Sequence, residues 1–239
     1  MSTLYTFGCS YTAEYKNNHA VEAYKKYKEY NGGNFPPTWV EVLANKLEIP
    51  FINYGIGGCG NNRIFQTFIQ HFNEIKKDDV VIIQWTYIHR YMWVRYERNA
   101  WEHFGAGSLN GADGITESTH EEICHNRTHP LYIEQIYEWM NFIDAYSKLV
   151  GFELYYWSGD CEIISPIEFS KRIDKKYLLS EFLKKDFTPF NKVFELGGKT
   201  IKEETNNLIN DLHFGESAHR IMGELFYNHI MKYKNVKLI

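Results

Sequence analysis

The chain has 239 residues, of which 44% are hydrophobic, and this size suits one α/β domain with a sizeable core. The net charge of −4 argues against a general nucleic-acid binder, because such proteins carry a basic excess or a basic stripe. No apolar run approaches the roughly 18 residues that a membrane span requires, so we expect neither a nucleic acid nor a membrane as partner.

The first part of the sequence alternates short apolar runs with amphipathic segments. Residues 3–8 predict a strand that ends at Gly8, and residues 13–35 predict a polar loop with some helix. Pro36-Pro37 opens an amphipathic helix, because the apolar residues that follow repeat at helical spacing. Residues 51–54 predict a short buried strand.

The same alternation continues in the middle of the chain. Asn61 or Asn62 is expected to cap a helix whose apolar residues recur at spacings of three and four. Residues 80–83 are wholly apolar, which is typical of a strand inside a parallel sheet. Residues 87–130 lack a clean period, and they predict an insertion that forms a lid or a wall.

The last part of the chain completes the pattern. Residues 131–149 predict a helix, residues 152–157 a strand and residues 210–219 a loop, whereas residues 160–200 fit no single element. A final amphipathic helix begins at Ser217. The order of these elements implies a three-layer α/β/α fold, in which helices cover both faces of a mostly parallel sheet in a single domain.

Ligands of such sheets lie at the carboxyl ends of the strands. Three unusual loops are predicted at those ends, namely Gly8-Cys9-Ser10, Gly55 to Gly60, and Gln84-Trp85-Thr86. A serine becomes a nucleophile when a base removes its proton, and the base is commonly a histidine that a carboxylate orients. Asp211-Leu212-His213 lies just before the last helix and supplies such a pair.

These residues resemble the motifs of the SGNH hydrolases, also called the GDSL esterase/lipase family. Gly8-Cys9-Ser10 resembles that family's first block, and Asn53 to Gly58 resembles the second. Asp211 to Gly215, followed by Ala218-His219, resembles the last block. The resemblance covers both ends of the chain and the middle strand, while residues 87–200 carry no motif. It implies an SGNH or flavodoxin-like fold.

The resemblance also implies a catalytic role for individual residues. Ser10 would be the nucleophile and His213 the general base, and Asp211 would orient the imidazole. Ser10, Gly58 and Thr86 would form the oxyanion hole, which stabilises the negative charge on the attacked carbonyl oxygen. Neither a metal nor an organic cofactor is needed. The substrate would be a small-molecule or carbohydrate ester, and an O-acetylated carbohydrate would fit the 17% aromatic content.

The sequence departs from the family pattern at three positions. Cys9 replaces the Asp of the first block, at a position that is not the nucleophile. The spacing before His213 is one residue short, so that Asn210 is the alternative to Asp211 as the partner of the histidine. The Gly-x-Asn-Asp block after the third strand is missing, and Thr86 stands at the position of its Asn. A non-catalytic binding or structural module on the same fold is therefore the alternative function.

Other features allow two interpretations each. Cys9 could be a thiol nucleophile, but a buried structural cysteine is favoured, and His219 is favoured as a residue that packs against a helix. The cluster from His120 to His129 could hold a metal or form a polar loop or helix. Six aromatic residues could line a sugar cleft or pack inside the insertion, and these are Trp85, Tyr87, Tyr91, Trp93, Tyr96 and Trp101.

The cysteines and the start of the sequence bear on the compartment. The 4 cysteines are widely spaced, which favours reduced thiols, and no basic signal-peptide segment precedes the first predicted strand. We therefore expect a cytoplasmic protein. The Gly-Cys-Ser variant is similar to SGNH-like proteins of phages and their bacterial hosts, so a virion-associated protein is the alternative.

Overall fold

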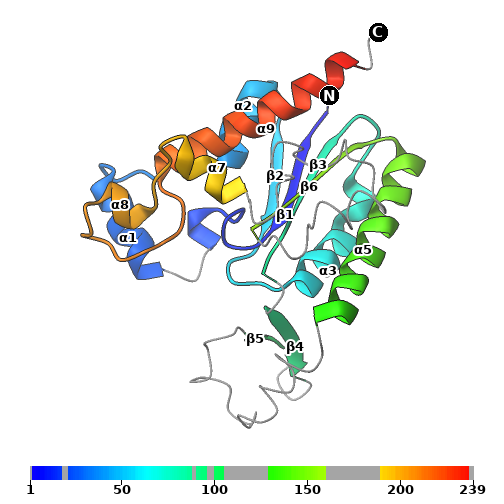
Figure 1. Cartoon of the computed structure of the whole chain (residues 1–239), viewed down its shortest axis with the longest axis horizontal. Coiled ribbons are helices and arrows are strands. Elements are labelled where there is room, and N and C mark those ends of the chain that lie inside the picture. The colour runs from blue at the N-terminus through cyan, green and yellow to red at the C-terminus, as the bar shows by residue number, and fades with distance from the viewer. Residues whose placement is uncertain are drawn as a thin grey trace.

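The structure is a computed structural model that describes residues 2–17, 21–87, 90–95, 100–104, 129–159 and 189–236. A four-stranded sheet forms its centre, with strand order β2-β1-β3-β6 and every neighbouring pair parallel (Figure 1). Its strands are β1 (Leu4–Gly8), β2 (Phe51–Gly55), β3 (Val80–Trp85) and β6 (Glu153–Ser158). β1 and β3 are buried along their whole length, as the apolar runs predict.

Helices cover both faces of this sheet. α2 (Trp39–Leu47) and α9 (Glu216–Val236) lie on one face, and α3 (Asn61–His71) and α5 (His129–Val150) lie on the other (Figure 1). The predicted three-layer α/β/α fold with a parallel sheet is therefore confirmed. Among the described residues, no helix is long and apolar enough to span a membrane.

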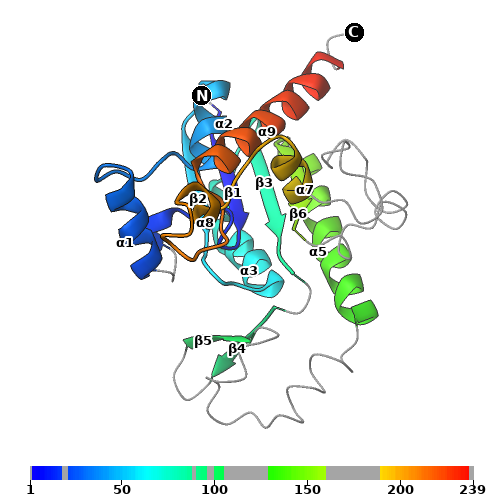
Figure 2. The same ribbon diagram turned by 60° about the vertical axis from the view of Figure 1, so that its left-hand side comes forward.

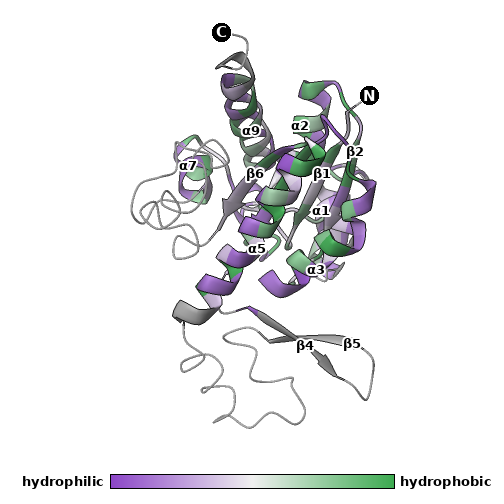
Figure 3. Ribbon diagram, turned by 90° about the vertical axis from the view of Figure 1, so that its right-hand side faces the viewer, coloured by the Kyte–Doolittle hydropathy of each residue, from purple (hydrophilic) through white to green (hydrophobic). Residues whose placement is uncertain are grey.

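Each face of the sheet has its own hydrophobic core. Phe7, Phe68 and Tyr156 belong to the core under α3 and α5, and Trp39 and Trp157 belong to the core under α2 and α9. Figure 3 shows that hydrophobic and hydrophilic residues alternate along these helices, as expected for helices that bury one face. The two tryptophans meet edge to face, with ring centroids 6.1 Å apart.

The helix starts differ in detail from the sequence-based expectation. α2 begins at Trp39, after the prolines, because Thr38 caps it and forms a capping box with Glu41. The N-cap of α3 is Gly60, so the predicted cap at Asn61 or Asn62 is wrong. Asn61 is instead the first residue of the helix, and its side chain bonds to the backbone of Thr86.

Several smaller elements complete the fold. The antiparallel pair β4 (Tyr91–Arg95) and β5 (Ala100–Phe104) forms a separate sheet, and Figure 2 shows it beyond the ends of β1 and β3. These strands belong to the predicted insertion, of which residues 88–89, 96–99 and 105–128 lie outside the described part of the chain. The remaining elements are η1 (Tyr15–Asn17), α1 (Val21–Tyr30), η2 (Phe72–Glu74), α7 (Pro189–Glu195) and α8 (Ile201–Glu204).

Candidate active site

The strand order brings the three predicted loops to one edge. β1 lies between β2 and β3, with Gly8 opposite Gly55 and Phe7 opposite Ile83. After β2 the chain passes back across β1 to form β3, so the topological switch point falls between β1 and β3. Ligands of open parallel sheets bind at such a point, outside the carboxyl ends of the strands. Ser10 follows one of these two strands and Thr86 follows the other.

A tight turn carries Ser10 at the end of β1. The carbonyl oxygen of Cys9 accepts hydrogen bonds from the N–H groups of Thr12 and Ala13, each at 2.9 Å. The turn packs closely against the end of β2, so that a Cβ on Gly55 would lie 2.4 Å from the backbone nitrogen of Ala13. Gly55 is therefore required for this approach, and Ser10 is left 7% exposed.

Side chains from three elements fix this turn. The Gln84 Oε1 accepts from the Thr12 hydroxyl at 2.6 Å and from the Cys9 N–H at 3.3 Å. The Asn53 amide donates to the Thr12 carbonyl at 2.7 Å, and the indole N–H of Trp39 donates to the Tyr11 carbonyl at 2.8 Å. The backbone around Ser10 is thus held from β3, β2 and α2 at once.

Cys9 is part of this support. Its side chain is fully buried, and its Sγ accepts a hydrogen bond from the Gln84 amide at 3.1 Å. The neighbouring Cys59 thiol donates to the carbonyl of Gly8 at 3.4 Å, and burial raises its pKa well above the usual range. The burial of Cys9 and the hydrogen bond that its Sγ accepts fit the interpretation of this residue as a structural cysteine.

Asp211 and His213 form a tightly bonded pair. The Asp211 Oδ1 lies 2.7 Å from the His213 Nδ1 and also accepts the His213 backbone N–H at 2.7 Å. Burial raises the pKa of Asp211, but the hydrogen bonds from His213 outweigh it and hold the net pKa below the ordinary value. Asn210 is exposed, so the partner of the imidazole is the carboxylate of Asp211.

The pair is oriented so that the outer ring nitrogen is available. An ionised carboxylate only accepts hydrogen bonds, so the proton of the neutral imidazole resides on Nδ1 and the lone pair on Nε2. The His213 side chain is 28% exposed, whereas that of Asp211 is 6% exposed. The Tyr11 ring lies 5.1 Å from the His213 ring, between centroids, so the residue next to Ser10 contacts the histidine.

Backbone hydrogen bonds hold the segment that carries this pair. The carbonyls of Asp211 and His213 accept from the first N–H groups of α8, those of Lys202 at 2.8 Å and Ile201 at 2.9 Å. These helix N–H groups have no partner within their own helix, and here they anchor the histidine segment. Thr200 and Phe214 form an isolated antiparallel bridge beside them.

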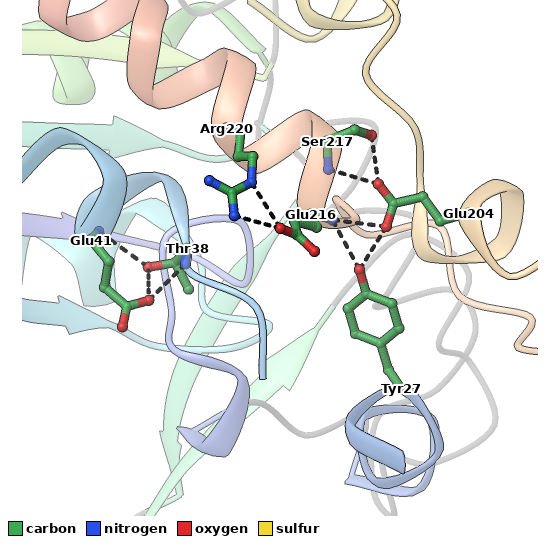
Figure 4. Close-up of polar contacts among 7 residues, drawn as sticks. All are labelled: Tyr27, Thr38, Glu41, Glu204, Glu216, Ser217 and Arg220. Carbon is green, nitrogen blue, oxygen red and sulfur yellow. Dashed lines mark hydrogen bonds and ion pairs between the residues drawn. The ribbon is translucent and has the colours of Figure 1, made fainter. Parts of the chain in front are cut away.

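A carboxylate clamp fixes the end of the same segment. Figure 4 shows Glu204 at the start of α9, where it accepts from the backbone N–H groups of Glu216 at 2.9 Å and Ser217 at 2.7 Å. The hydroxyl of Tyr27, on α1, donates to the same carboxylate at 2.7 Å. A carboxylate at a helix N-terminus is favourable because it meets unpaired N–H groups and the positive end of the helix dipole.

The Gly-rich loop contributes a backbone donor at this edge. Gly58 is exposed and has a φ of 73°, a left-handed conformation that glycine adopts at little cost. Within the described part of the chain its N–H donates no hydrogen bond. An available N–H near a nucleophile is what an oxyanion hole requires.

The position of Thr86 differs from that of an open oxyanion donor. Thr86 is 1% exposed, and both its N–H and its carbonyl are bonded to the Asn61 side chain, at 2.7 Å and 3.0 Å. The Arg90 Nη1 donates to the Thr86 hydroxyl at 3.4 Å. Thr86 thus lies at the expected edge, but its polar groups serve to join β3, α3 and Arg90.

His219 has a structural position. Its Nδ1 accepts the backbone N–H of Trp39, the first residue of α2, at 3.1 Å. It is fully buried between Tyr15 and Phe214, and burial lowers its pKa to about 3, with a smaller contribution from the charge of His213. The histidine is therefore neutral and satisfies an end group of the helix.

Parts of two predicted clusters lie outside the described residues. Of the candidate metal cluster, residues 120–128 are not described, and His129 is described only as the first residue of α5. Within the described residues no group of His, Cys, Asp and Glu could hold a metal ion. Among the six aromatic residues, Trp85 is fully buried in the core beside Trp139, so it does not line a cleft.

Comparison with known proteins adds no assignment to this geometry. No protein-family model matches the chain, and no curated protein matches it either.

The sequence analysis assigned no supporting role to four residues that shape this edge. Asn61 was expected to cap a helix, and Gln84 was named only as part of a loop at the end of a strand. Arg90 follows β3 within a segment that has no period, and Glu204 lies in a segment to which no element was assigned. Their roles depend on tertiary contacts, which a single sequence does not reveal.

Proposed function

We propose that the chain is a serine ester hydrolase of the SGNH type that transfers an acyl group through Ser10. The observation that carries the proposal is the Asp211–His213 pair, whose ring contacts Tyr11 at the turn that holds Ser10. A pair of this kind supports nucleophilic catalysis because the carboxylate fixes the tautomer of the imidazole and stabilises its protonated form.

The first half of the reaction forms an acyl-enzyme. The Ser10 Oγ attacks the ester carbonyl while the His213 Nε2 takes the hydroxyl proton. The backbone N–H groups of Ser10 and Gly58 stabilise the oxyanion of the tetrahedral intermediate. The C–O bond to the alcohol then breaks, and His213 returns the proton to the departing alcohol oxygen.

The second half of the reaction releases the acid. His213 takes a proton from water, whose oxygen attacks the acyl carbon. The tetrahedral intermediate collapses with cleavage of the bond to the Ser10 Oγ, and His213 gives the proton to that oxygen. Neither a metal nor an organic cofactor takes part in this scheme.

We propose an acetylated carbohydrate as the substrate class. Tyr11, which is partly exposed, lies beside the histidine, with its ring centroid 5.1 Å from that of His213. Aromatic faces provide large apolar contact area together with a polar group, which suits the mixed surface of a sugar. A panel of acetylated sugars and of longer acyl esters, each as substrate for the purified protein, tests this choice.

The catalytic assignment is tested with a fluorophosphonate probe, which labels activated serines. We expect labelling of the wild type and none of Ser10→Ala. Ser147→Ala is a matched control, because Ser147 is also buried but bonds to the Asp144 carbonyl on α5, and it should label like the wild type. Absence of labelling in the wild type, or equal labelling of Ser10→Ala, would contradict the proposal.

One observation favours the alternative, a non-catalytic module on the same fold. Thr86, at the position of the family's oxyanion Asn, is buried and accepts a hydrogen bond from Arg90 through its hydroxyl. Loss of one oxyanion donor costs about 10²–10³ in turnover, so a protein without a replacement could have lost its activity. A wild type that neither reacts with the probe nor hydrolyses any ester of the panel would support this alternative.

A further inference from the structure

Arg90 places a positive charge at the switch point between β1 and β3. It lies on the segment after β3, and its guanidinium carbon is 5.1 Å from the centroid of the Tyr87 ring. Its backbone is fixed against the Gly-rich loop, because a Cβ on Gly60 would lie 2.4 Å from the Arg90 carbonyl oxygen. The N–H of Arg90 donates to the Tyr87 carbonyl at 3.1 Å.

The charge of Arg90 acts on both loops that would form the oxyanion hole. It opposes the effect of burial, which raises the pKa of Tyr11, the residue after Ser10. It likewise opposes the effect of burial on the pKa of Cys59, the residue after Gly58. The guanidinium also donates to the hydroxyl of Thr86. Its guanidinium therefore contacts Thr86, and its charge acts on the residues that follow Ser10 and Gly58 in the sequence.

Arg90 has no ion-pair partner among the described carboxylates. No Asp or Glu of the described residues lies within ion-pair distance of its guanidinium. A half-buried guanidinium is costly unless it meets a negative charge, and it has five donors in a fixed planar arrangement. An oxyanion that forms during the reaction is a charge of this kind, and it forms at this edge.

We propose that Arg90 is a further catalytic residue, whose guanidinium donates to the oxyanion of the tetrahedral intermediate and replaces the missing Asn. This inference rests on the function proposed above. The Thr86 hydroxyl is then a group that holds the guanidinium in place. The interaction strengthens when the neutral carbonyl becomes an oxyanion, so Arg90 lowers the barrier of the chemical step more than it strengthens substrate binding.

The test compares wild type, Arg90→Met, Arg90→Lys and the control Arg63→Met. Arg63 is a suitable control because its charge also acts on Cys59, but its Nη1 donates to Gln66 on the same helix. We measure kcat and KM for p-nitrophenyl acetate, a neutral ester, and the rate of fluorophosphonate labelling. For Arg90→Met we expect kcat and labelling to fall by about 10²–10³ with KM nearly unchanged.

Two further measurements separate this role from a structural one. Added ethylguanidine should restore part of the activity of Arg90→Met, because it supplies the lost donor without repairing a fold. Arg90→Lys keeps the charge and should lose less activity than Arg90→Met. If Arg90→Met does not fold, the comparison of Arg90→Lys with the wild type still tests the role of Arg90. Thermal unfolding of each variant shows whether the fold is intact.

The inference is overturned if folded Arg90→Met hydrolyses the neutral ester at the wild-type kcat. It is also overturned if the loss appears only as a raised KM for esters with an anionic group, such as a succinyl ester, because Arg90 would then bind substrate. A wild type that never labels at Ser10 defeats the proposed function itself, together with this inference. Wild-type labelling with an unaffected Arg90→Met defeats this inference alone.

Discussion

Asp211 binds His213 twice through one oxygen, since its Oδ1 accepts the backbone N–H and faces the Nδ1, both at 2.7 Å. One carboxylate oxygen thereby fixes the conformation of the Asp-Leu-His segment and the orientation of the imidazole. This geometry depends on the short spacing of the pair, in which only Leu212 lies between the carboxylate and the histidine. The short spacing is thus compatible with a catalytic pair.

The first prediction distinguishes Asp211 from its neighbour. Asp211→Asn keeps the shape but removes the charge, and its amide can turn an N–H toward the imidazole and favour the wrong tautomer. We expect turnover of the ester substrate to fall by about 10³–10⁴. Asn210→Ala is the control, because Asn210 is exposed, and it should retain wild-type turnover. A large loss in Asn210→Ala with an active Asp211→Asn would reverse the assignment.

The second prediction concerns the buried support of the Ser10 turn. Gln84→Leu leaves the Thr12 hydroxyl and the Cys9 N–H without their acceptor inside the core. We expect it to lower the free energy of unfolding, measured with urea, by about 2–4 kcal/mol. Gln66→Leu removes an amide that accepts from Arg63 on the surface of α3, and it should change stability by less than about 0.5 kcal/mol. Equal stability of the two variants would show that the Gln84 network is not needed.

The fold was largely predictable because its signals are local. The apolar run at residues 80–83 and the spacing of Ile64 and Phe68 predict a buried strand and a helix without any tertiary information. It was also predictable that the three loops lie close together, because parallel strands place their carboxyl ends at one edge of the sheet. The helix cap at Gly60 was missed because Asn61, a good cap by type, bonds instead to the distant backbone of Thr86.

The support of the candidate site could not be predicted in the same way. Glu204 contacts Tyr27, which is 177 residues away in the sequence, and no periodicity reveals such a contact. Gln84 and Arg90 act through side chains that reach across neighbouring strands and loops. Ser10 and His213 could be predicted as nucleophile and base from their residue types and positions in the sequence. The residues that hold them are recognisable only from their contacts in three dimensions.

The third prediction tests the Glu204 clamp. Glu204→Gln removes the charge and presents an amide to the N–H groups of Glu216 and Ser217, so we expect a loss of about 1–2 kcal/mol of unfolding free energy. Glu195→Gln removes a carboxylate that pairs with Lys192 on the surface, and it should stay within about 0.5 kcal/mol of the wild type. If Glu204→Gln has the same free energy of unfolding as the wild type, the clamp does not stabilise α9.

The fourth prediction probes the same clamp from its other side. A Cβ on Gly215 would overlap the Glu204 carboxylate. Gly215→Ala must therefore displace either this carboxylate or the backbone that connects His213 to Gly215. We expect lower stability and lower ester turnover, both measured on the purified variant. Because the Ala methyl clashes with the Glu204 side chain, the double variant Gly215→Ala/Glu204→Ala should be less impaired than the sum of its single variants. Simple additivity would contradict this explanation.

The last prediction is the pH dependence of stability that His219 imposes. Its pKa is 6.5 when unperturbed and about 3 in the folded chain, where burial disfavours the charged form. Between these values the unfolded chain binds one proton more than the folded chain, so unfolding becomes easier as the pH falls. From pH 6.5 downward, this residue should remove roughly 1 kcal/mol of unfolding free energy per pH unit, and above pH 6.5 it should have no effect. His219→Asn keeps an acceptor for the Trp39 N–H but does not titrate, so urea unfolding of this variant should show a flatter slope between pH 6.5 and 4.5. An identical slope in the variant and the wild type would mean that His219 is already protonated in the fold.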